Sequence, residues 1–362
     1  MVSGGCFRRP ALDSAAGPVH VSAMTGYRHP IAVAPMMDWT DRYCRVFHRR
    51  LTRRALLYTE MIVADAILHG DRQRLLAYSD EEHPVALQLG GSEPKKLAEA
   101  ARIAAGYGYD EINLNVGCPS DRVKAGTFGA CLMRTPELVG DCVAAMTAAV
   151  KLPVTVKCRI GVDEQDPETS LDALAGSVIA AGATAIWVHA RKAWLKGLSP
   201  RENRDVPPLD YGRVYRLKQS RPGTFIGING GVGTLGEAAE HLRHVDGVMI
   251  GRAAYQTPAV LADVDRTFYG EPGPAEGDLR EAVAGHLPQI EAWLAEGRRL
   301  GAIVRPLLGL FHGASGARSW RQILTVEASR PGAGVGVVER ALAALDRTPK
   351  SSETGDSASA AA

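Results

Sequence analysis

Residues 111–120 read Glu-Ile-Asn-Leu-Asn-Val-Gly-Cys-Pro-Ser, so a β-strand pattern runs straight into a cysteine with glycine before it and proline after it. Proline ends a strand because it lacks a backbone N–H. We therefore predict a strand up to about Val116 and a loop that presents the thiol of Cys118. The glycine-rich stretch at 124–129 is typical of places where the backbone approaches a ligand. A lone cysteine is more often an inert small hydrophobe, so its neighbours must decide its role.

Similar short runs rich in Val and Ile recur along the chain, separated by alanine-rich stretches of helical character. There are eight of them, at 31–35, 55–61, 85–89, 111–116, 154–159, 185–189, 224–229 and 247–251. Continuous apolar strands joined by helices indicate a parallel sheet that is covered on its outer side. Eight such units predict an α/β fold, a closed (β/α)₈ TIM barrel, whose last helix we expect after Pro258.

From about Glu276 the pattern changes to helices alone. Apolar residues at helical spacing form two stripes, at Leu287, Ile290, Trp293 and Leu294 and at Val304, Leu307, Leu308 and Phe311. We predict a disordered N-terminal extension at 1–26, a catalytic barrel at 27–275, a helical domain at 276–346 and a disordered tail at 347–362. The extension lacks the continuous apolar core of a secretory signal, and Met24 is an alternative start.

The composition excludes several classes of protein. Hydrophobic residues make up 46% and charged residues 23% of the 362 residues, which is ordinary for a soluble globular chain. We expect no membrane span, because no run of about 18 apolar residues occurs. The six cysteines form no Cys-x-x-Cys pair and have no histidine partner at zinc-ligand spacing, so we expect reduced cytoplasmic thiols and no metal.

The net charge of +2 neither requires nor excludes a nucleic-acid partner, but its distribution is uneven. Between Gly297 and Val326 there are five arginines and no acidic residue. We therefore predict a positive face on the helical domain.

Polar and sulfur-containing side chains stand at or just after the ends of five predicted strands: Met36, Gln88, Cys118, Lys157 and His189. In a TIM barrel, the carboxyl ends of the strands meet at one face, and that face carries the active site. The sequence thus predicts that these residues share one site.

The chain resembles the flavin-dependent tRNA-dihydrouridine synthases. Seven motifs carry the resemblance in order: Pro35-Met36-Met37-Asp38, Gln88-Leu89-Gly90, Asn113-Leu114-Asn115-Val116-Gly117-Cys118-Pro119, Lys157-Cys158-Arg159, His189-Ala190-Arg191, Asn229-Gly230-Gly231 and Gly251-Arg252. The likeness runs from about Tyr27 to about Asp346, and the segment 189–204 further resembles the bacterial A subgroup, which acts at positions 20 and 20a of the D-loop. The resemblance implies an enzyme with FMN that uses NADPH, or alternatively NADH, to reduce uridine in tRNA to 5,6-dihydrouridine.

Glycines near the predicted seventh and eighth strands suggest where a phosphate would bind. Gly231-Val-Gly-Thr-Leu-Gly236 matches the dinucleotide fingerprint of a Rossmann dehydrogenase, but that fold needs an acidic residue ending its second strand, whereas Asp246 precedes its strand. In a TIM barrel, the loops after strands seven and eight commonly bind a phosphate through backbone N–H groups. Asn229-Gly230-Gly231 and Gly251-Arg252 occupy those places, which favours a mononucleotide such as FMN over NAD. The alternative is that these glycines only serve tight turns.

The resemblance also implies roles around the flavin ring. Pro35, Met36 and Met37 would form its apolar seat, Gln88 would meet its pyrimidine edge, and His189 would donate to the ring or the phosphate. Lys157 lies in an apolar strand and needs an anionic partner, which the N1/O2 edge of the reduced flavin would supply. The alternatives are a barrel-floor plug for the methionines, a core histidine for His189 and a structural salt bridge for Lys157.

By the same resemblance, the N5 atom of reduced FMN gives hydride to C6 of uracil and Cys118 gives a proton to C5 from the opposite face. A thiol with its ordinary pKa of about 8.5 is mostly protonated at neutral pH and can serve as a general acid. Asn115, just before the cysteine loop, is placed to hydrogen-bond the uracil edge. Since no dinucleotide domain is expected, the nicotinamide would reduce FMN in a separate half-reaction with ping-pong kinetics.

The target base is stacked inside folded tRNA and must be extruded before it can react. Arginine is the natural partner of phosphates, and the best candidates for tRNA contacts are Arg201, Arg204, Arg318 and Arg321. The alternative for each is a solvated surface charge. We interpret Trp194 and Trp320 as packing residues and expect a monomer.

Two alternative functions fit part of these features. A small-molecule FMN barrel reductase of the dihydroorotate dehydrogenase type would keep the barrel and the flavin but would not need a basic helical domain. A non-catalytic tRNA-binding protein would need neither Lys157 nor Cys118.

Overall fold

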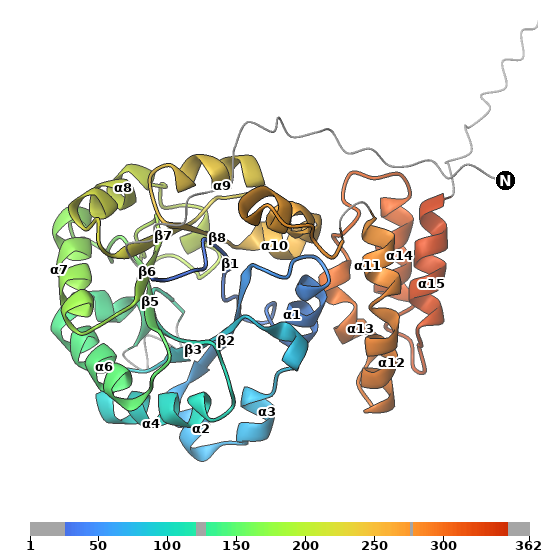
Figure 1. Ribbon diagram of the computed structural model, residues 1–362. Helices are drawn as coiled ribbons and strands as arrows, with labels where there is room; N and C mark the ends of the chain where they lie inside the picture. Colours follow the sequence, from blue (N-terminus) through green and yellow to red (C-terminus); the bar gives the residue numbers. More distant parts are fainter. Residues whose placement is uncertain (1–25, 121–127, 276–277, 347–362) are drawn as a thin grey trace, which may run out of the picture.

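The computed structural model describes residues 26–120, 128–275 and 278–346, and its parallel strands close into one barrel in sequence order (Figure 1). The strands are β1 Ile31–Val33, β2 Leu56–Val63, β3 Val85–Gly90, β4 Glu111–Val116, β5 Val154–Arg159, β6 Ala185–His189, β7 Phe225–Asn229 and β8 Gly247–Ile250. The last strand pairs with the first, Ala32 beside Met249, so the sheet has no free edge. The predicted (β/α)₈ barrel is confirmed.

Helices cover the outer side of the barrel, as the continuous apolar strands require (Figure 1). They are α1 Arg42–Arg49, α2 Ala64–His69, α3 Arg72–Leu76, α4 Pro94–Ala105, α6 Pro136–Ala149, α7 Pro167–Ala180, α8 Tyr211–Ser220, α9 Leu235–Leu242 and α10 Arg252–Gln256. Several begin at a side chain that accepts a hydrogen bond from the first turn: Asp41 caps α1 and Asp166 caps α7. Proline at the first helical turn, as at Pro94 of α4, needs no N–H partner.

The interior of the barrel is plugged at one level by an aromatic cluster. Trp187 on β6 packs edge-to-face against Phe225 and Tyr27, with ring centroids 5.4 and 6.5 Å apart, and all three side chains are buried. A Cβ atom at Gly227 would lie 2.2 Å from the Trp187 ring, so glycine is required there for the indole to fit. This cluster closes the barrel interior below the ends of the strands.

The last barrel segment differs from the prediction. Instead of a regular α-helix after Pro258, the chain forms a 3₁₀ helix at Pro258–Asp263 and a π-helical turn at Asp265–Tyr269. The side chain of Asp265 explains the local path, because it accepts hydrogen bonds from the Thr52 hydroxyl and from the backbone N–H of Arg53 and Arg54, on the loop before β2.

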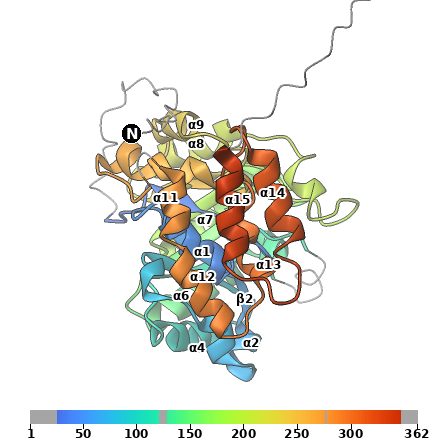
Figure 2. The same cartoon turned by 90° about the vertical axis from the view of Figure 1, so that its right-hand side faces the viewer.

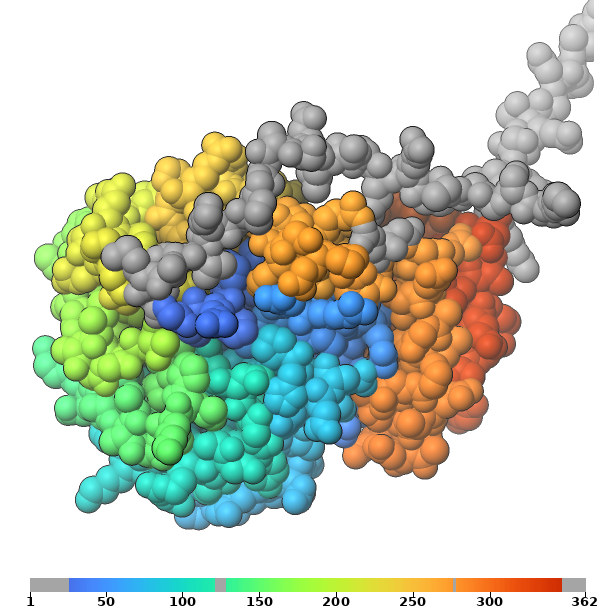
Figure 3. All heavy atoms as spheres, in the orientation of Figure 1, coloured from blue at the N-terminus to red at the C-terminus, as the bar shows by residue number. Residues whose placement is uncertain are grey.

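Helices α11 Leu279–Ala284, α12 Leu287–Ala295, α13 Leu300–Ile303, α14 Ala317–Val326 and α15 Gly336–Ala343 form a separate group beside α1. Figure 2 shows α14 and α15 side by side, and Figure 3 shows the group in direct contact with the barrel. Rings from α1 and from the helical group interlock: Phe47 contacts His286 at 5.4 Å between centroids and Tyr43 contacts Trp293 at 4.8 Å.

One predicted helical stripe is wrong. Val304, Leu307 and Phe311 are buried as expected, but only Leu300–Ile303 is α-helical, and a 3₁₀ turn at Arg305–Leu307 and further turns follow. Pro306 is the physical reason, because it has no backbone N–H and disfavours the α conformation at the residue before it.

Four predicted features lie wholly or partly outside the described residues. They are residues 1–25 of the N-terminal extension, residues 124–127 of the glycine-rich stretch, the domain boundary at Glu276 and the tail at 347–362. No helix among the described residues is both long and apolar enough to cross a membrane.

Candidate active site

The structure brings the predicted flavin-site residues together through the strand register. Asn115 on β4 pairs with Lys157 on β5, and His189 on β6 pairs with Asn229 on β7. Gln88 stands one strand further, on β3, where it is buried. These residues therefore surround one barrel mouth, as the sequence predicts from their places at the strand ends.

The loop that carries Cys118 is held at several points. Asn115 Oδ1 accepts hydrogen bonds from the backbone N–H of Gly117 at 3.1 Å and of Cys118 at 2.9 Å. The backbone carbonyl of Cys118 accepts from the N–H of Ala130 at 2.9 Å, and its half-buried thiol lies 3.5 Å from the Ser120 hydroxyl. The thiol is thus held in a defined position at the end of β4.

Arg159 braces the same loop from β5. Its side chain is buried, and its Nε donates to the Gly117 carbonyl at 2.9 Å. Its Nη1 donates to the carbonyls of Lys192 and Asn203, both at 2.9 Å, which ties the Cys118 loop to the loop after β6. Arg159 had no predicted role beyond its place in the motif Lys157-Cys158-Arg159. The signal was present, since an arginine that ends an apolar strand must satisfy its donors locally.

Lys157 is a cation without a carboxylate partner among the described residues. Its Nζ donates to the neutral side-chain oxygen of Asn229 at 3.0 Å. Burial, and secondarily the nearby Arg159 guanidinium, lower the pKa of Lys157 to about 8. Among the described residues, Lys157 therefore forms no structural salt bridge, which was the alternative interpretation. The site thus offers a poorly solvated positive charge.

His189 lies beside Lys157 and Arg159, and burial, together with these cations, lowers its pKa well below the ordinary value. The imidazole is therefore neutral at physiological pH and can donate one hydrogen bond while accepting another.

The glycines after β7 allow the backbone to pass His189 closely. Gly230 has φ of 120° and Gly231 has φ of 74°, both in the region that favours glycine. A Cβ at Gly230 would lie 2.7 Å from His189 Cδ2, and a Cβ at Gly231 would lie 2.7 Å from the Tyr211 hydroxyl. At these two positions the backbone passes beside the site without a side chain.

The remaining residues of the dinucleotide fingerprint, from Gly233 onward, form the start of helix α9. The N–H groups of Gly233 and Thr234 donate to the Glu237 carboxylate, and Thr234 caps α9 in return. The fingerprint lies after the seventh strand of a closed barrel, so the Rossmann reading is excluded.

The remaining predicted flavin residues stand at the same mouth. Pro35, Met36 and Met37 follow β1, and the Met37 side chain is 55% exposed. Met36 is half-buried, and its N–H donates to the Thr40 hydroxyl at 3.0 Å. Gly251 follows β8 and precedes α10, where Arg252 forms an ion pair with Asp205 at 2.7 Å.

The four arginines predicted to contact tRNA are all exposed. Arg201 and Arg204 lie on the loop after β6, and Arg204 stands within electrostatic reach of Cys118. Arg318 and Arg321 lie three residues apart on α14, so they share one helix face.

Of the two tryptophans interpreted as packing residues, Trp320 is fully packed, whereas Trp194 is only partly covered. Trp320 is buried and its indole donates to the Leu307 carbonyl at 3.0 Å. Half-buried Trp194 lies under Lys192, whose Nζ is 5.5 Å from the ring centroid.

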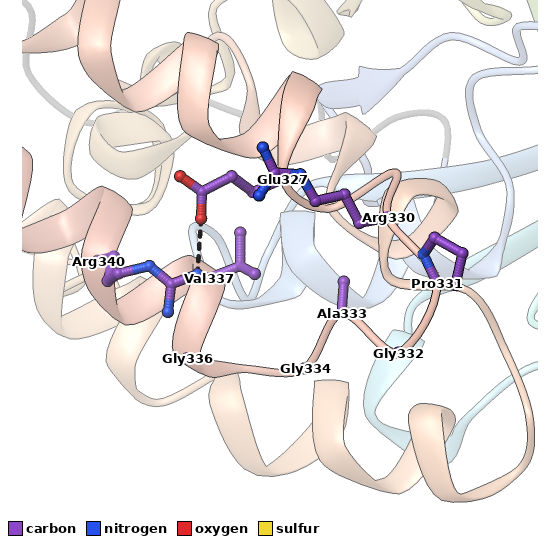
Figure 4. A pocket seen from close by; sticks show the side chains of 9 residues that line it. All are labelled: Glu327, Arg330, Pro331, Gly332, Ala333, Gly334, Gly336, Val337 and Arg340. Carbon is purple, nitrogen blue, oxygen red and sulfur yellow. Dashed lines mark hydrogen bonds and ion pairs between the residues drawn. The ribbon is translucent and has the colours of Figure 1, made fainter.

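A cavity of about 310 Å³ lies in the helical domain, away from the barrel mouth (Figure 4). The loop between α14 and α15 forms it, and the Glu327–Arg340 ion pair at 2.6 Å lines it. None of the predicted site residues lines this cavity. No group of three or more His, Cys, Asp or Glu within the described ranges could hold a metal ion.

Comparisons with known proteins agree with the fold and the motifs. A solved 2-naphthoyl-CoA reductase complex aligns with a TM-score of 0.50 at 10% identity, over 67% of this chain and 50% of that one, which shows a shared fold. The tRNA-dihydrouridine(20/20a) synthase of Xanthomonas campestris pv. campestris is 57% identical over 311 residues, covering 86% of this chain and 92% of the relative. The corresponding Yersinia pestis protein is 57% identical over 313 residues, covering 86% of this chain and 90% of that relative. The family model described as dihydrouridine synthase matches residues 32–344. The chain therefore belongs to the dihydrouridine synthase family.

Proposed function

We propose that this protein reduces uridine to 5,6-dihydrouridine in the D-loop of tRNA, at positions 20 and 20a, with bound FMN and with NADPH as the electron donor. The observation that supports it best is the presence of a thiol and a half-buried cation on neighbouring strands: Cys118 follows β4, and Lys157 lies on β5 beside Asn115. The relatives named tRNA-dihydrouridine(20/20a) synthase support the substrate and the positions. We expect the protein to act as a cytoplasmic monomer.

The residues at the barrel mouth fit a flavin mononucleotide. Lys157 lacks a carboxylate partner among the described residues and suits the electron-rich edge of a flavin ring. Gly230 and Gly231 have positive φ and carry no side chain, so their backbone can approach a phosphate, with Gly251 and Arg252 beside it. Gln88 keeps one N–H and one lone pair beyond the bonds it makes within the barrel, and Met36 and Met37 supply apolar surface.

A reduced flavin in this place supplies a hydride for the C5–C6 double bond of uracil. The protein must then provide a proton at the other carbon, and Cys118 Sγ is the group that we assign to this step. Asn115 and Arg159 hold its loop from two sides, so the thiol is oriented before the base arrives. Arg204 and Arg201 stand on the rim, where an incoming phosphate would be attracted.

The proposed function predicts that purified protein, NADPH and unmodified tRNA transcript yield dihydrouridine at positions 20 and 20a. The measurement is mass spectrometry of nuclease fragments, with NADH run in parallel. A reductase of the dihydroorotate type would instead reduce a free pyrimidine and leave tRNA unchanged. A protein that only binds tRNA would show no flavin absorption bands after purification.

A second prediction concerns the helical domain. Arg318→Ala/Arg321→Ala should weaken tRNA binding and flatten the slope of log affinity against log salt by up to about 2, because two phosphate contacts are lost. Flavin content and NADPH oxidation with an artificial acceptor should stay normal, since the barrel site is untouched.

The matched control removes two exposed arginines from barrel helices, Arg102 on α4 and Arg243 at the end of α9. It changes the net charge by the same amount. An equal loss of tRNA affinity and of salt slope in this control would show that α14 is not the docking surface.

A further inference from the structure

The inner face of β4 is polar along its whole length. Glu111, Asn113 and Asn115 alternate with Ile112, Leu114 and Val116, and all six side chains are buried. The apolar set belongs to the main core, so the polar set faces the barrel interior. TIM-barrel interiors are usually filled by branched apolar residues, and a buried polar group is costly unless it is hydrogen-bonded. These polar residues therefore need an explanation.

A continuous series of hydrogen bonds satisfies them and crosses three strands, β3, β4 and β5. In order from the mouth inward, the donors and acceptors are Cys118 N–H to Asn115 Oδ1 at 2.9 Å, Asn115 Nδ2 to Gln88 Oε1 at 2.8 Å, Gln88 Nε2 to Asn113 Oδ1 at 2.8 Å, Asn113 Nδ2 to Thr155 Oγ1 at 2.8 Å, and Thr155 Oγ1 to Glu111 Oε1. We call this series the amide ladder. It joins the loop of Cys118 to a carboxylate at the other end of β4.

The amide ladder has only one consistent direction. A backbone N–H can only donate, so the N–H groups of Gly117 and Cys118 require the oxygen of Asn115 to face them. The NH₂ group of Asn115 then faces Gln88 and requires its oxygen, and the same requirement passes on to Asn113. Each amide is thus oriented by its neighbour.

The inner end of the ladder imposes the same direction. The Thr155 hydroxyl accepts from Asn113, so its own hydrogen must go to an acceptor, which is Glu111 Oε1. The Glu111 carboxylate also accepts from the hydroxyls of Tyr58, at Oε1, and Tyr27, at Oε2. A carboxylate suits three donors because it offers only acceptor sites.

Protonation of the Glu111 carboxyl group preserves its hydrogen bond with Thr155. Burial raises the pKa of Glu111 to about 7, against the effect of the three hydroxyl donors. A proton on Oε2 would face Tyr27 and leave Oε1, which accepts from Thr155, as an acceptor.

We propose that Glu111 is a positioning residue for the reaction: through the hydroxyl of Thr155 it fixes the orientation of the amides of Asn113, Gln88 and Asn115, and so the position of the Cys118 loop. This inference rests on the proposed function for the roles of Gln88 and Cys118. It assigns no contact with substrate to Glu111 or Thr155. The alternative is that the buried polar groups only stabilise the barrel.

Thr155→Val tests the proposal, because valine has nearly the shape of threonine but neither donates nor accepts a hydrogen bond. The Asn113 amide then loses its acceptor, so the amides are held in this orientation only from the mouth end, by the N–H groups of Gly117 and Cys118. We expect the single-turnover reduction of uridine to fall about tenfold or more while tRNA affinity stays within about twofold. The visible absorption bands of the flavin should shift, because Gln88 lies at its site. Thr155→Ser, which keeps the hydroxyl, should have the wild-type single-turnover rate and the wild-type flavin absorption bands.

A measurement without turnover separates this proposal from the proposed function. Alkylation of Cys118 by iodoacetamide, followed by mass spectrometry of its peptide, reports the position of the loop in any preparation. We expect the rate in Thr155→Val to differ from the wild-type rate by about threefold or more, and the rate in Thr155→Ser to match it. If the wild-type protein makes no dihydrouridine but the alkylation rate changes, the ladder stands and the proposed function fails.

A folded Thr155→Val protein with wild-type alkylation, spectrum and single-turnover rate would overturn the proposal. If that variant does not fold, Glu111→Gln takes its place, since glutamine keeps the size and replaces one acceptor oxygen by a donor. One hydroxyl must then reverse, and we expect a smaller change of the same kind in alkylation and rate. Wild-type values for both in Glu111→Gln would equally reject the role.

Discussion

Cys118→Ala is expected to lower the single-turnover rate of uridine reduction by about 10²- to 10⁴-fold, the usual contribution of a positioned general acid. The flavin should still bind, and NADPH should still reduce it at the wild-type rate, because the thiol is not needed for that half-reaction. Stopped-flow absorbance follows the flavin in both half-reactions, first with NADPH and then with tRNA. The two half-reactions should therefore separate in this variant.

The matched control is Cys131→Ser, which changes another half-buried thiol on the 3₁₀ helix Gly129–Arg134, close in sequence to Cys118. Ser variants of Cys142 and Cys158 should likewise lower the rate of uridine reduction far less than Cys118→Ala, since both thiols are buried and cannot contact the substrate. A loss of less than about tenfold in Cys118→Ala would reject its role as the proton donor.

Lys157→Met is expected to weaken flavin binding by about 10- to 100-fold, the range for losing one hydrogen bond to a charged group. Methionine keeps most of the length of the side chain and removes the charge, so the barrel should still fold. Equilibrium dialysis with FMN measures the affinity, and reduction by NADPH should also be impaired. Lys151→Met is the control, because Lys151 is exposed and precedes the opposite end of the same strand, β5.

The pH dependence follows from the lowered pKa of Lys157, which is about 8 in the protein without flavin. Below that pH the lysine is charged and attracts the flavin; above it, binding requires the uptake of a proton. Flavin affinity should therefore fall as the pH rises above about 8, by at most about tenfold per pH unit, and Lys157→Met should remove this dependence. Wild-type affinity that stays constant between about pH 7 and pH 10 would contradict the assignment.

The barrel was predictable because its signals are local. The bounds of β4, β5 and β6 agree with the apolar runs at 111–116, 154–159 and 185–189, each of which is preceded by a turn-forming or polar residue. The meeting of Gln88, Lys157 and His189 at one mouth followed as well, since parallel strands bring their carboxyl ends to one face.

Long-range contacts limited the prediction elsewhere. The 3₁₀ and π turns at Pro258–Asp263 and Asp265–Tyr269 depend on hydrogen bonds between Asp265 and a loop about two hundred residues earlier. The bracing of Gly117 by Arg159 joins two strands that are more than forty residues apart in the chain. A window of neighbouring residues contains only one member of each of these hydrogen-bonded pairs.

The sequence by itself determined the alternation of strands and helices, the places of Cys118 and Lys157 at strand ends, and the family. Only the tertiary structure decided how Glu111, Thr155 and Gln88 are connected, and that Lys157 meets an amide rather than a carboxylate. The physical reason is that strand patterns arise from the period of neighbouring side chains. Hydrogen bonds across the barrel arise from the register between strands, which closure of the barrel sets for all of them together.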